Sequence, residues 1–212
     1  MDETQKAKNK FNYKKTLNTE LTKFKNSKSM IIITGELAAG KTSYGKKISR
    51  ALEIPFFSKD KIKELLYDSF SCENLDYGAK RKLGATSYSI FYYIMEEQMK
   101  VGKTLIVESN FVKESVPIIK KLLKKYNYKS ITIRFEGDLQ ILHKRFLKRE
   151  YSTERHIGLV SNGVFDDFKN FEQATLKSKE FKMSNNELLV DTTDFSRVDF
   201  DEIIYNILNS LL

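Results

Sequence analysis

The residues with the clearest chemical potential form one octapeptide, Gly35-Glu36-Leu37-Ala38-Ala39-Gly40-Lys41-Thr42. It fits the pattern G-x-x-x-x-G-K-[ST], in which glycines allow a tight turn whose backbone N–H groups point at phosphate oxygens. Lys41 would reach the β- and γ-phosphates of a nucleotide, and the Thr42 hydroxyl would bind Mg²⁺. Ser43 would continue this cradle into the first turn of the following helix, whose positive end favours phosphate. The sequence therefore predicts nucleotide binding at residues 35–43.

Transfer of a phosphoryl group to a hydroxyl needs further carboxylates. Asp60 follows a predicted strand at 54–58, and we expect it to orient the acceptor hydroxyl or to begin the next helix, or both. Glu108 ends the apolar run 105–107 and could position Mg²⁺ through water, or it could pair with a nearby lysine. Asn110 could hydrogen-bond a metal-bound water or the substrate.

Arginines form a third group of candidate site residues. Arg145 and Arg149 are four residues apart in a predicted helix at 138–150, so they are expected on one helix face. Arg155 follows in a polar segment, 151–163. These arginines predict a lid that closes over the transferred phosphate and stabilises its charge, with an ordinary solvated basic surface as the alternative.

The elements that must position these residues alternate between strand and helix. Apolar runs predict strands at 30–34, 54–58, 104–108, 130–135 and 186–190. Helical patterns fall at 43–52, 59–67, 75–99, 112–126, 138–150, 164–179 and 200–211. Apolar strands that alternate with helices are typical of a buried parallel sheet. We therefore expect an α/β fold of three layers, with a five-stranded parallel sheet, helices on both faces and a lid.

Composition limits the organisation and the setting of the chain. Its 212 residues and 41% hydrophobic content suit one domain, at 29–212. Residues 1–29 hold eight lysines and three acids, hence +5 of the net +9. Tyr13, Leu17, Leu21 and Phe24 nevertheless share one helix face, so residues 1–28 are expected to form a lysine-rich helical extension; a disordered basic arm is the alternative.

Cys72 is the single cysteine, which excludes an internal disulfide and favours a reducing, cytoplasmic setting. No apolar stretch reaches the roughly 18–20 residues of a membrane span, and the N-terminus lacks the apolar core of a signal peptide. We therefore expect a protein that does not enter a membrane. The basic charge invites a nucleic-acid partner, but the lysines are scattered along the chain.

Four segments together resemble the P-loop kinase superfamily. They are the octapeptide, Phe57-Ser58-Lys59-Asp60-Lys61-Ile62, Val107-Glu108-Ser109-Asn110-Phe111 and Arg145-Phe146-Leu147-Lys148-Arg149. The resemblance is to its predicted ATP-binding kinases, related to chloramphenicol phosphotransferase, zeta toxin, shikimate and gluconate kinases and the kinase domain of polynucleotide kinase. It implies that Asp60 activates the acceptor hydroxyl, that Lys63 grips substrate, and that Arg145, Arg149 and Arg155 belong to the lid. The chain departs from the family pattern in the 36–39 stretch, which lacks the usual extra Gly and Pro, and at Glu108, where aspartate is common.

From these residues we expect a kinase that uses ATP and Mg²⁺ and phosphorylates a hydroxyl of a small molecule. ATP is preferred over GTP because the sequence has no Asn-Lys-x-Asp guanine signature. Two alternatives stay open. One is a kinase for the 5′-hydroxyl of a polynucleotide, with the lysine-rich N-terminus along the backbone, and the other is an ATP-binding regulatory module without turnover.

Overall fold

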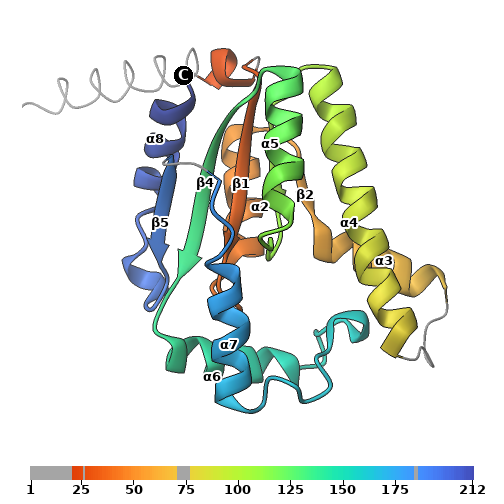
Figure 1. Cartoon of the computed structure of the whole chain (residues 1–212). Helices are drawn as coiled ribbons and strands as arrows, with labels where there is room; N and C mark the ends of the chain where they lie inside the picture. The colour runs from red at the N-terminus through yellow and green to blue at the C-terminus, as the bar shows by residue number, and fades with distance from the viewer. Residues whose placement is uncertain (1–20, 26, 71–76, 184–185) are drawn as a thin grey trace, which may run out of the picture.

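The computed structural model describes residues 21–25, 27–70, 77–183 and 186–212 (Figure 1). All five described strands lie in one parallel sheet in the order β2-β3-β1-β4-β5. They are β1 (Ser29–Gly35), β2 (Phe56–Ser58), β3 (Leu105–Glu108), β4 (Lys129–Glu136) and β5 (Glu187–Asp191). The predicted five-stranded parallel sheet is confirmed.

Helices cover both faces of this sheet (Figure 1). They are α2 (Lys41–Leu52), α3 (Lys59–Ser69), α4 (Tyr77–Lys100), α5 (Ser115–Tyr126), α6 (Leu139–Glu150), α7 (Phe168–Ser178) and α8 (Phe200–Leu211), with short 3₁₀ turns η1 (Ile157–Leu159) and η2 (Phe195–Arg197). Alternate side chains of β1 serve the two faces: Ile31 and Ile33 pack with α2 and α8, whereas Met30 and Ile32 pack with α4 and α5. This double burial explains why the strand is a continuous apolar run.

The carboxyl ends of the strands bring the polar segments together. Gly35 ends β1, Ser58 ends β2 and Glu108 ends β3, and Ser58 lies opposite Glu108 in the register of the two strands. In an open parallel sheet, ligands bind beyond this edge. Figure 1 shows α6 and α7 lying past the same edge, below the end of β4.

An arm made of α6, the lid segment (residues 151–167) and α7 therefore stands next to the octapeptide; we call it the lid arm. Asp138 caps α6 by accepting a hydrogen bond from the Ile141 N–H at 3.0 Å. α7 begins at Phe168, later than the sequence pattern predicts, because Asp167 caps it by accepting from the Asn170 N–H at 3.0 Å.

The described end of the N-terminal extension packs on the domain. Residues 21–25 are helical, and Phe24 is 0% exposed within the core that contains Ile31 and Ile33. The Thr104 hydroxyl donates to the Phe24 carbonyl at 2.9 Å. Tyr13 and Leu17 lie outside the described residues, so an extension over residues 1–28 stays a prediction. Within the described part of the chain, no helix combines the length and apolarity needed to cross a bilayer.

Candidate active site

A cavity of about 1010 Å³ lies at the carboxyl edge of the sheet, between the octapeptide, α3, the end of β3 and the lid arm. The predicted site residues that line it are Leu37, Ala38, Gly40, Lys41, Thr42, Ser43, Asp60, Lys63, Glu108, Asn110, Arg149 and Arg155. Gly35, Glu36, Ala39 and Arg145 are not among its lining residues. The volume lies at the upper end of the range for small-molecule sites, which leaves room for a nucleotide and a small second substrate.

The octapeptide has the backbone of a phosphate-binding turn. Gly35 has φ +129°, and a Cβ there would lie 2.0 Å from the Phe135 carbonyl oxygen. Gly40 has φ +82° and Ala38 has φ +61°, both in the region that favours residues with little or no side chain. α2 begins at Lys41, directly after this turn, so its positive end faces the cavity edge.

Lys41 is a buried cation that lines the cavity. Its Nζ donates to the backbone carbonyl of Glu36 at 2.5 Å and to that of Gly35 at 3.2 Å. Burial lowers the pKa of Lys41 to about 8, against the charges of Glu108 and Asp60, which favour the protonated amine. An anion placed beside Lys41 would favour the charged form further, as a phosphate would.

Glu108 and Asn110 line the cavity, and each has a buried oxygen without a protein partner among the described residues. Glu108 Oε2 and Asn110 Oδ1 are both inaccessible and have no hydrogen-bond partner within the described residues. Burial raises the pKa of Glu108, while Lys41 and a hydrogen bond from Ser58 oppose that shift. Buried oxygens of this kind need a donor or a cation. Water held by Mg²⁺ would supply both, so the donor set fits the metal that the fold implies.

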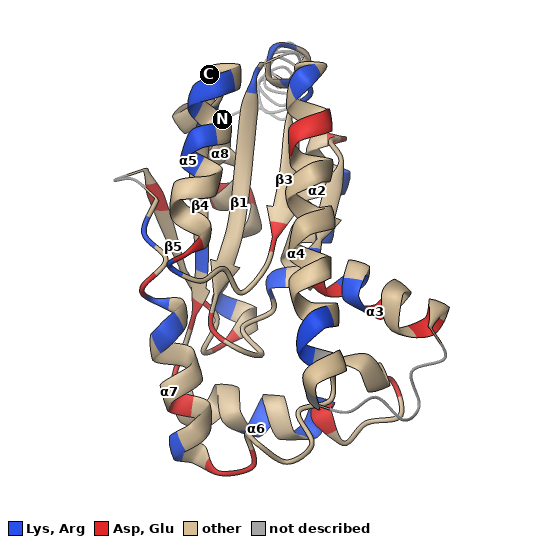
Figure 2. Cartoon of the chain, turned by 45° about the vertical axis from the view of Figure 1, so that its right-hand side comes forward, with Lys and Arg blue, Asp and Glu red and all other residues tan. Residues whose placement is uncertain are grey.

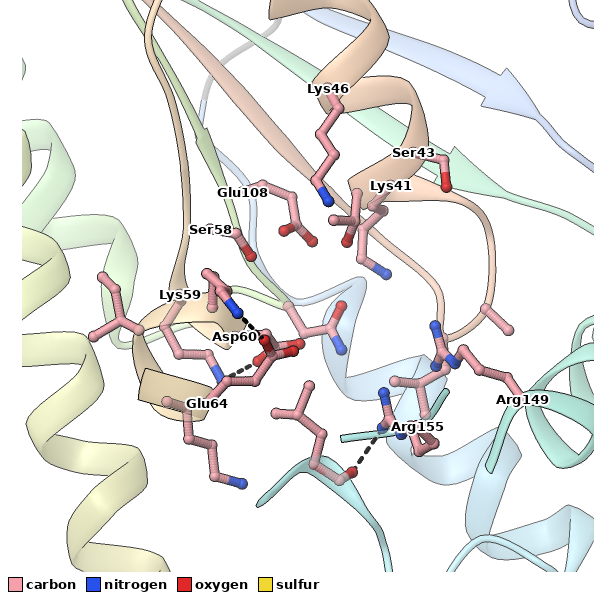
Figure 3. A pocket seen from close by; sticks show the side chains of 18 of the residues that line it. Lys41, Ser43, Lys46, Ser58, Lys59, Asp60, Glu64, Glu108, Arg149 and Arg155 are labelled. Atoms are coloured by element: carbon pink, nitrogen blue, oxygen red, sulfur yellow. Dashed lines mark hydrogen bonds and ion pairs between the residues drawn. The ribbon is translucent and has the colours of Figure 1, made fainter. Parts of the chain in front are cut away.

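Asp60 is in the first turn of α3, which starts directly after β2, and it points into the cavity (Figure 3). Lys59 Nζ lies 2.5 Å from Asp60 Oδ1. Burial would raise the pKa of Asp60, but the charges of Lys59, Lys41 and Lys63 outweigh it, and the pKa lies below its usual value. Asp60 is thus an ionised hydrogen-bond acceptor.

Sequence reasoning missed Lys59. Its ammonium lies over the Tyr88 ring, 5.4 Å from the centroid, and the ion pair with Asp60 raises its pKa against the effect of burial. The Tyr88 hydroxyl donates to the Asn110 carbonyl at 3.0 Å, so Tyr88 connects Lys59 with the segment after β3. The only signal in the sequence was its position next to Asp60.

Arg149 and Arg155 face the cavity together from the lid arm (Figure 3). Arg155 Nε lies 3.1 Å from Glu150 Oε2, and its Nη2 donates to the Leu159 carbonyl at 2.6 Å. The Arg149 guanidinium has no ion pair or hydrogen bond with the described residues, although solvent reaches it through the cavity. Desolvation and the charge of Arg155 lower the pKa of Arg149. An unpaired guanidinium next to a second one is suited to bind an anion.

Arg145 lies elsewhere, although it shares α6 with Arg149. Its Nη1 donates to the Thr192 carbonyl at 2.6 Å and its Nη2 to the Thr193 carbonyl at 2.8 Å, after β5. The guanidinium also lies 4.1 Å from the centroid of the Phe195 ring. One helical turn therefore separates an arginine held by backbone carbonyls from one that faces the cavity. The two arginines do not both line the cavity, although the spacing predicts a shared helix face.

Among the described residues, no carboxylates beyond those predicted from the sequence are grouped to form a metal site. The described residues contain no group of three or more His, Cys, Asp or Glu side chains arranged to hold a metal ion. Thr42 lines the cavity at the start of α2, on the same cavity as Glu108 and Asn110. A cation there would depend on one hydroxyl, on water and on phosphate oxygens, which is the usual setting of Mg²⁺ rather than of Ca²⁺ or Zn²⁺.

Comparison with known proteins finds solved structures with a similar fold. We found no matching family model and no matching curated protein. A “putative kinase” from Chloroflexus aurantiacus is 27% identical, with a TM-score of 0.75 over 87% of this chain and 98% of that one. A sugar kinase from a Janibacter species is 14% identical (TM-score 0.54, 86% and 93% covered). Shikimate kinase from Bacteroides thetaiotaomicron is also 14% identical (TM-score 0.50, 85% and 95% covered).

Proposed function

Because this chain is by its fold a P-loop kinase, we propose that it is an ATP- and Mg²⁺-dependent phosphotransferase that phosphorylates a hydroxyl group of a small molecule. One observation carries the proposal: a single cavity brings together the phosphate-binding turn, an ionised carboxylate and an unpaired guanidinium. These are the groups that phosphoryl transfer needs for the donor, the acceptor and the developing charge. The likeness to a protein described as a kinase, over nearly all of both chains, supports it.

In this proposal, the donor phosphates lie on the turn formed by residues 35–42. Its backbone N–H groups and the start of α2 favour negative charge, and the Lys41 ammonium binds the β- and γ-phosphates. Phe195 offers an exposed ring, 42% accessible, beside Gly40, where a Cβ would lie 2.9 Å from that ring. We assign Arg145 and Phe195 to the base end of the nucleotide rather than to the transferred phosphate.

Thr42, Glu108 and Asn110 would hold the metal, Thr42 directly and the other two through bound water. When bound, Mg²⁺ would neutralise charge on the β- and γ-phosphates. The unpartnered oxygens of Glu108 and Asn110 support this assignment. The raised pKa of Glu108 also supports it, because a nearby cation would keep that buried carboxylate ionised.

Asp60 would orient the acceptor. Its carboxylate accepts a hydrogen bond from the acceptor hydroxyl, whose oxygen then attacks the γ-phosphorus in line with the bond to ADP. Because Lys59 lowers the pKa of Asp60, the carboxylate is a weak base. It would accept the hydroxyl proton only as the new P–O bond forms and the bond from the γ-phosphorus to the ADP oxygen breaks. Arg149 and Arg155 would stabilise charge on the phosphoryl group from the opposite side (Figure 3).

The experiment that tests the proposal is an acceptor panel with purified protein, ATP and Mg²⁺. ADP formation is measured with sugars, sugar acids, nucleosides, aminoglycosides, amphenicols and 5′-hydroxyl oligonucleotides, each compared with a reaction without acceptor. We expect one class of small hydroxyl compound to stimulate ADP formation and to gain a phosphate detectable by mass. Stimulation by oligonucleotides alone would instead favour the polynucleotide kinase.

Asp60→Asn separates an enzyme from a nucleotide-binding module. The amide keeps the size of the side chain but cannot take the proton, so turnover with the accepted compound should fall about 10²- to 10⁴-fold. Binding of a non-hydrolysable ATP analogue, measured by calorimetry, should persist. The matched control is Asp201→Asn on the exposed side of α8. If no compound stimulates the wild type while the analogue binds, the kinase proposal is wrong and the regulatory module is favoured.

A further inference from the structure

Glu36 is an acidic residue inside a loop that should attract anions, and its carboxylate points away from the cavity. The residue is 2% exposed and does not line the cavity. Glu36 Oε2 accepts a hydrogen bond from the Gly137 N–H at 2.9 Å, and Glu36 Oε1 lies 3.2 Å from Lys179 Nζ. Both carboxylate oxygens are therefore used, as burial of a charge requires.

The two partners of Glu36 mark the two ends of the lid arm. Gly137 lies between β4 and α6, where the chain enters the arm, and Lys179 directly follows α7, where the chain leaves it. One carboxylate from the phosphate-binding loop thus holds both ends of the segment that carries Arg149 and Arg155. Figure 1 shows α6 running across below the strand ends and α7 rising from the lid segment back toward them.

The exit of the arm has a second attachment that does not involve the loop. Arg134 of β4 donates to the carbonyls of Ser178 at 3.1 Å and Phe181 at 2.6 Å, and it pairs with Glu187 at 2.7 Å. The sheet therefore fixes where α7 ends. Glu36 adds a different connection. Its backbone is part of the phosphate-binding loop, and its side chain contacts Gly137 and Lys179 at the two ends of the lid arm.

The backbone of Glu36 contacts Lys41, the residue that would bind the phosphates. Its carbonyl accepts from Lys41 Nζ at 2.5 Å, and its N–H donates to the Phe135 carbonyl at 2.8 Å. A phosphate bound to the Lys41 ammonium would draw it away from the Glu36 carbonyl. The peptide that loses this partner can shift, and the attached carboxylate passes the shift to Gly137 and Lys179.

We propose that Glu36 is a positioning residue that couples nucleotide binding at the phosphate loop to the placement of the lid arm, and hence of Arg149 and Arg155. The effect on turnover rests on the proposed kinase function, whereas the effect of a bound nucleotide on the lid does not. Coupling of this kind requires that the ligand favour one arrangement of the arm over another. Glu36 provides the contact through which that preference reaches the arm.

The test compares the intact wild-type chain with Glu36→Gln, Lys179→Met and Lys182→Met. Glu36→Gln keeps an oxygen for the Gly137 N–H but loses the charge that Lys179 needs, and Lys179→Met removes the same ion pair from the exposed side. Lys182→Met is the matched control, because it removes an exposed lysine three residues away. A non-hydrolysable ATP analogue with Mg²⁺ is the probe, and its affinity is measured by calorimetry.

Hydrogen–deuterium exchange of residues 151–167, with and without the analogue, reports the coupling. We expect the analogue to slow exchange there in the wild type and in Lys182→Met. In Glu36→Gln and Lys179→Met the analogue should still bind, but the slowing should shrink at least about fivefold. With an accepted hydroxyl compound, kcat should fall about 10- to 100-fold in Glu36→Gln with little change in KM for ATP, because the lid arginines are misplaced.

Each outcome has a definite meaning. Full lid protection and wild-type kcat in both Glu36→Gln and Lys179→Met would overturn the coupling and leave the kinase proposal intact. Loss of protection with retained binding would support it, even if no acceptor has yet been found. If Glu36→Gln does not fold, Lys179→Met decides alone. If the analogue does not bind the wild type, both the proposed function and this inference are wrong.

Discussion

Single side chains in this cavity take their chemical character from their neighbours. Asp60 is ionised because Lys59, Lys41 and Lys63 outweigh the effect of burial, whereas Glu108 resists ionisation because burial dominates at its position. Two carboxylates with opposite shifts have different roles in many enzymes. Here the contrast supports Asp60 as the residue that meets the acceptor and Glu108 as one that depends on a cation.

Lys59→Met should change the pH dependence of turnover. Without the ammonium beside it, Asp60 loses the largest charge that lowers its pKa, so the pKa rises. Because the reaction needs ionised Asp60, the acidic limb of the kcat/KM profile should move to higher pH, while activity at alkaline pH changes less. Lys61→Met removes a lysine that pairs with Glu64 instead and should leave the limb in place. An unmoved limb in Lys59→Met would contradict the assignment of Lys59.

The lowered pKa of Lys41 predicts that nucleotide binding depends on pH in the alkaline range. Its pKa of about 8 in the free protein should rise when phosphate binds, so binding takes up a proton above that pH. Affinity for an ATP analogue should then fall as the pH rises through about 8, by up to about tenfold per pH unit. Calorimetry in buffers of different ionisation enthalpy measures the uptake. Absence of net uptake between pH 7.5 and 9 would contradict it.

At the scale of elements, α6 performs two tasks with one pair of arginines. Arg145 holds the helix to the carbonyls of Thr192 and Thr193, and Arg149, one turn further, faces the cavity with no hydrogen bond or ion pair to the described residues. The first interaction stabilises the fold, and the second is available to a ligand. Stability and catalysis should therefore separate along this helix.

Arg149→Ala and Arg145→Ala test that separation. Arg149→Ala should lower kcat about 10²- to 10³-fold, because charge on the transferred group loses a donor, with no loss of folding stability. Arg145→Ala removes two hydrogen bonds from a charged donor and should lower the free energy of unfolding by about 2–3 kcal/mol. Urea denaturation and steady-state kinetics measure the two effects. Equal losses of stability in both variants would contradict the division.

The sequence predicts the strands, helices and the phosphate-binding turn well, because the types of residue within each segment determine them. The apolar run at β1 and the turn at Gly35–Gly40 arise from burial on two faces and from backbone conformation, and both leave direct traces in residue types. The contacts of Arg145 depend on carbonyls 47 and 48 residues away. The direction of the Glu36 side chain depends on Gly137, 101 residues away. Helical spacing and a loop motif contain no information on such partners.

At the scale of the whole molecule, the N-terminal segment can be judged by its charge and by its packing on the core. Lysines and arginines occur on α4, α6 and α7 with acidic residues among them (Figure 2), so basic charge is not confined to residues 1–29. Phe24, by contrast, is part of the main core together with Ile48 and Leu211. A truncation that tests the lysines must therefore leave Phe24 in place.

Phe24→Ala should destabilise the domain. The side chain is 0% exposed, and its removal opens a cavity between the sheet and its helices, which costs about 3–5 kcal/mol. Thermal or urea denaturation measures the loss, and Lys23→Ala, an exposed neighbour, is the matched control. A stability change as small as that of the control would mean that residues 21–25 do not pack on the core in solution.

Removal of residues 1–20 tests the nucleic-acid alternative and leaves Phe24 in place. The segment contains Lys6, Lys8, Lys10, Lys14 and Lys15 against Asp2, Glu3 and Glu20, so its removal subtracts 5 − 3 = 2 positive charges. If these lysines followed a polynucleotide backbone, KM for a 5′-hydroxyl oligonucleotide would rise and its dependence on salt would become weaker, because fewer counterions would be released on binding. For a small uncharged acceptor neither quantity depends on the segment. We therefore expect the truncated chain to retain its kcat and the salt dependence of its turnover with the accepted compound. A loss of turnover confined to oligonucleotides would reverse the choice between the two acceptors.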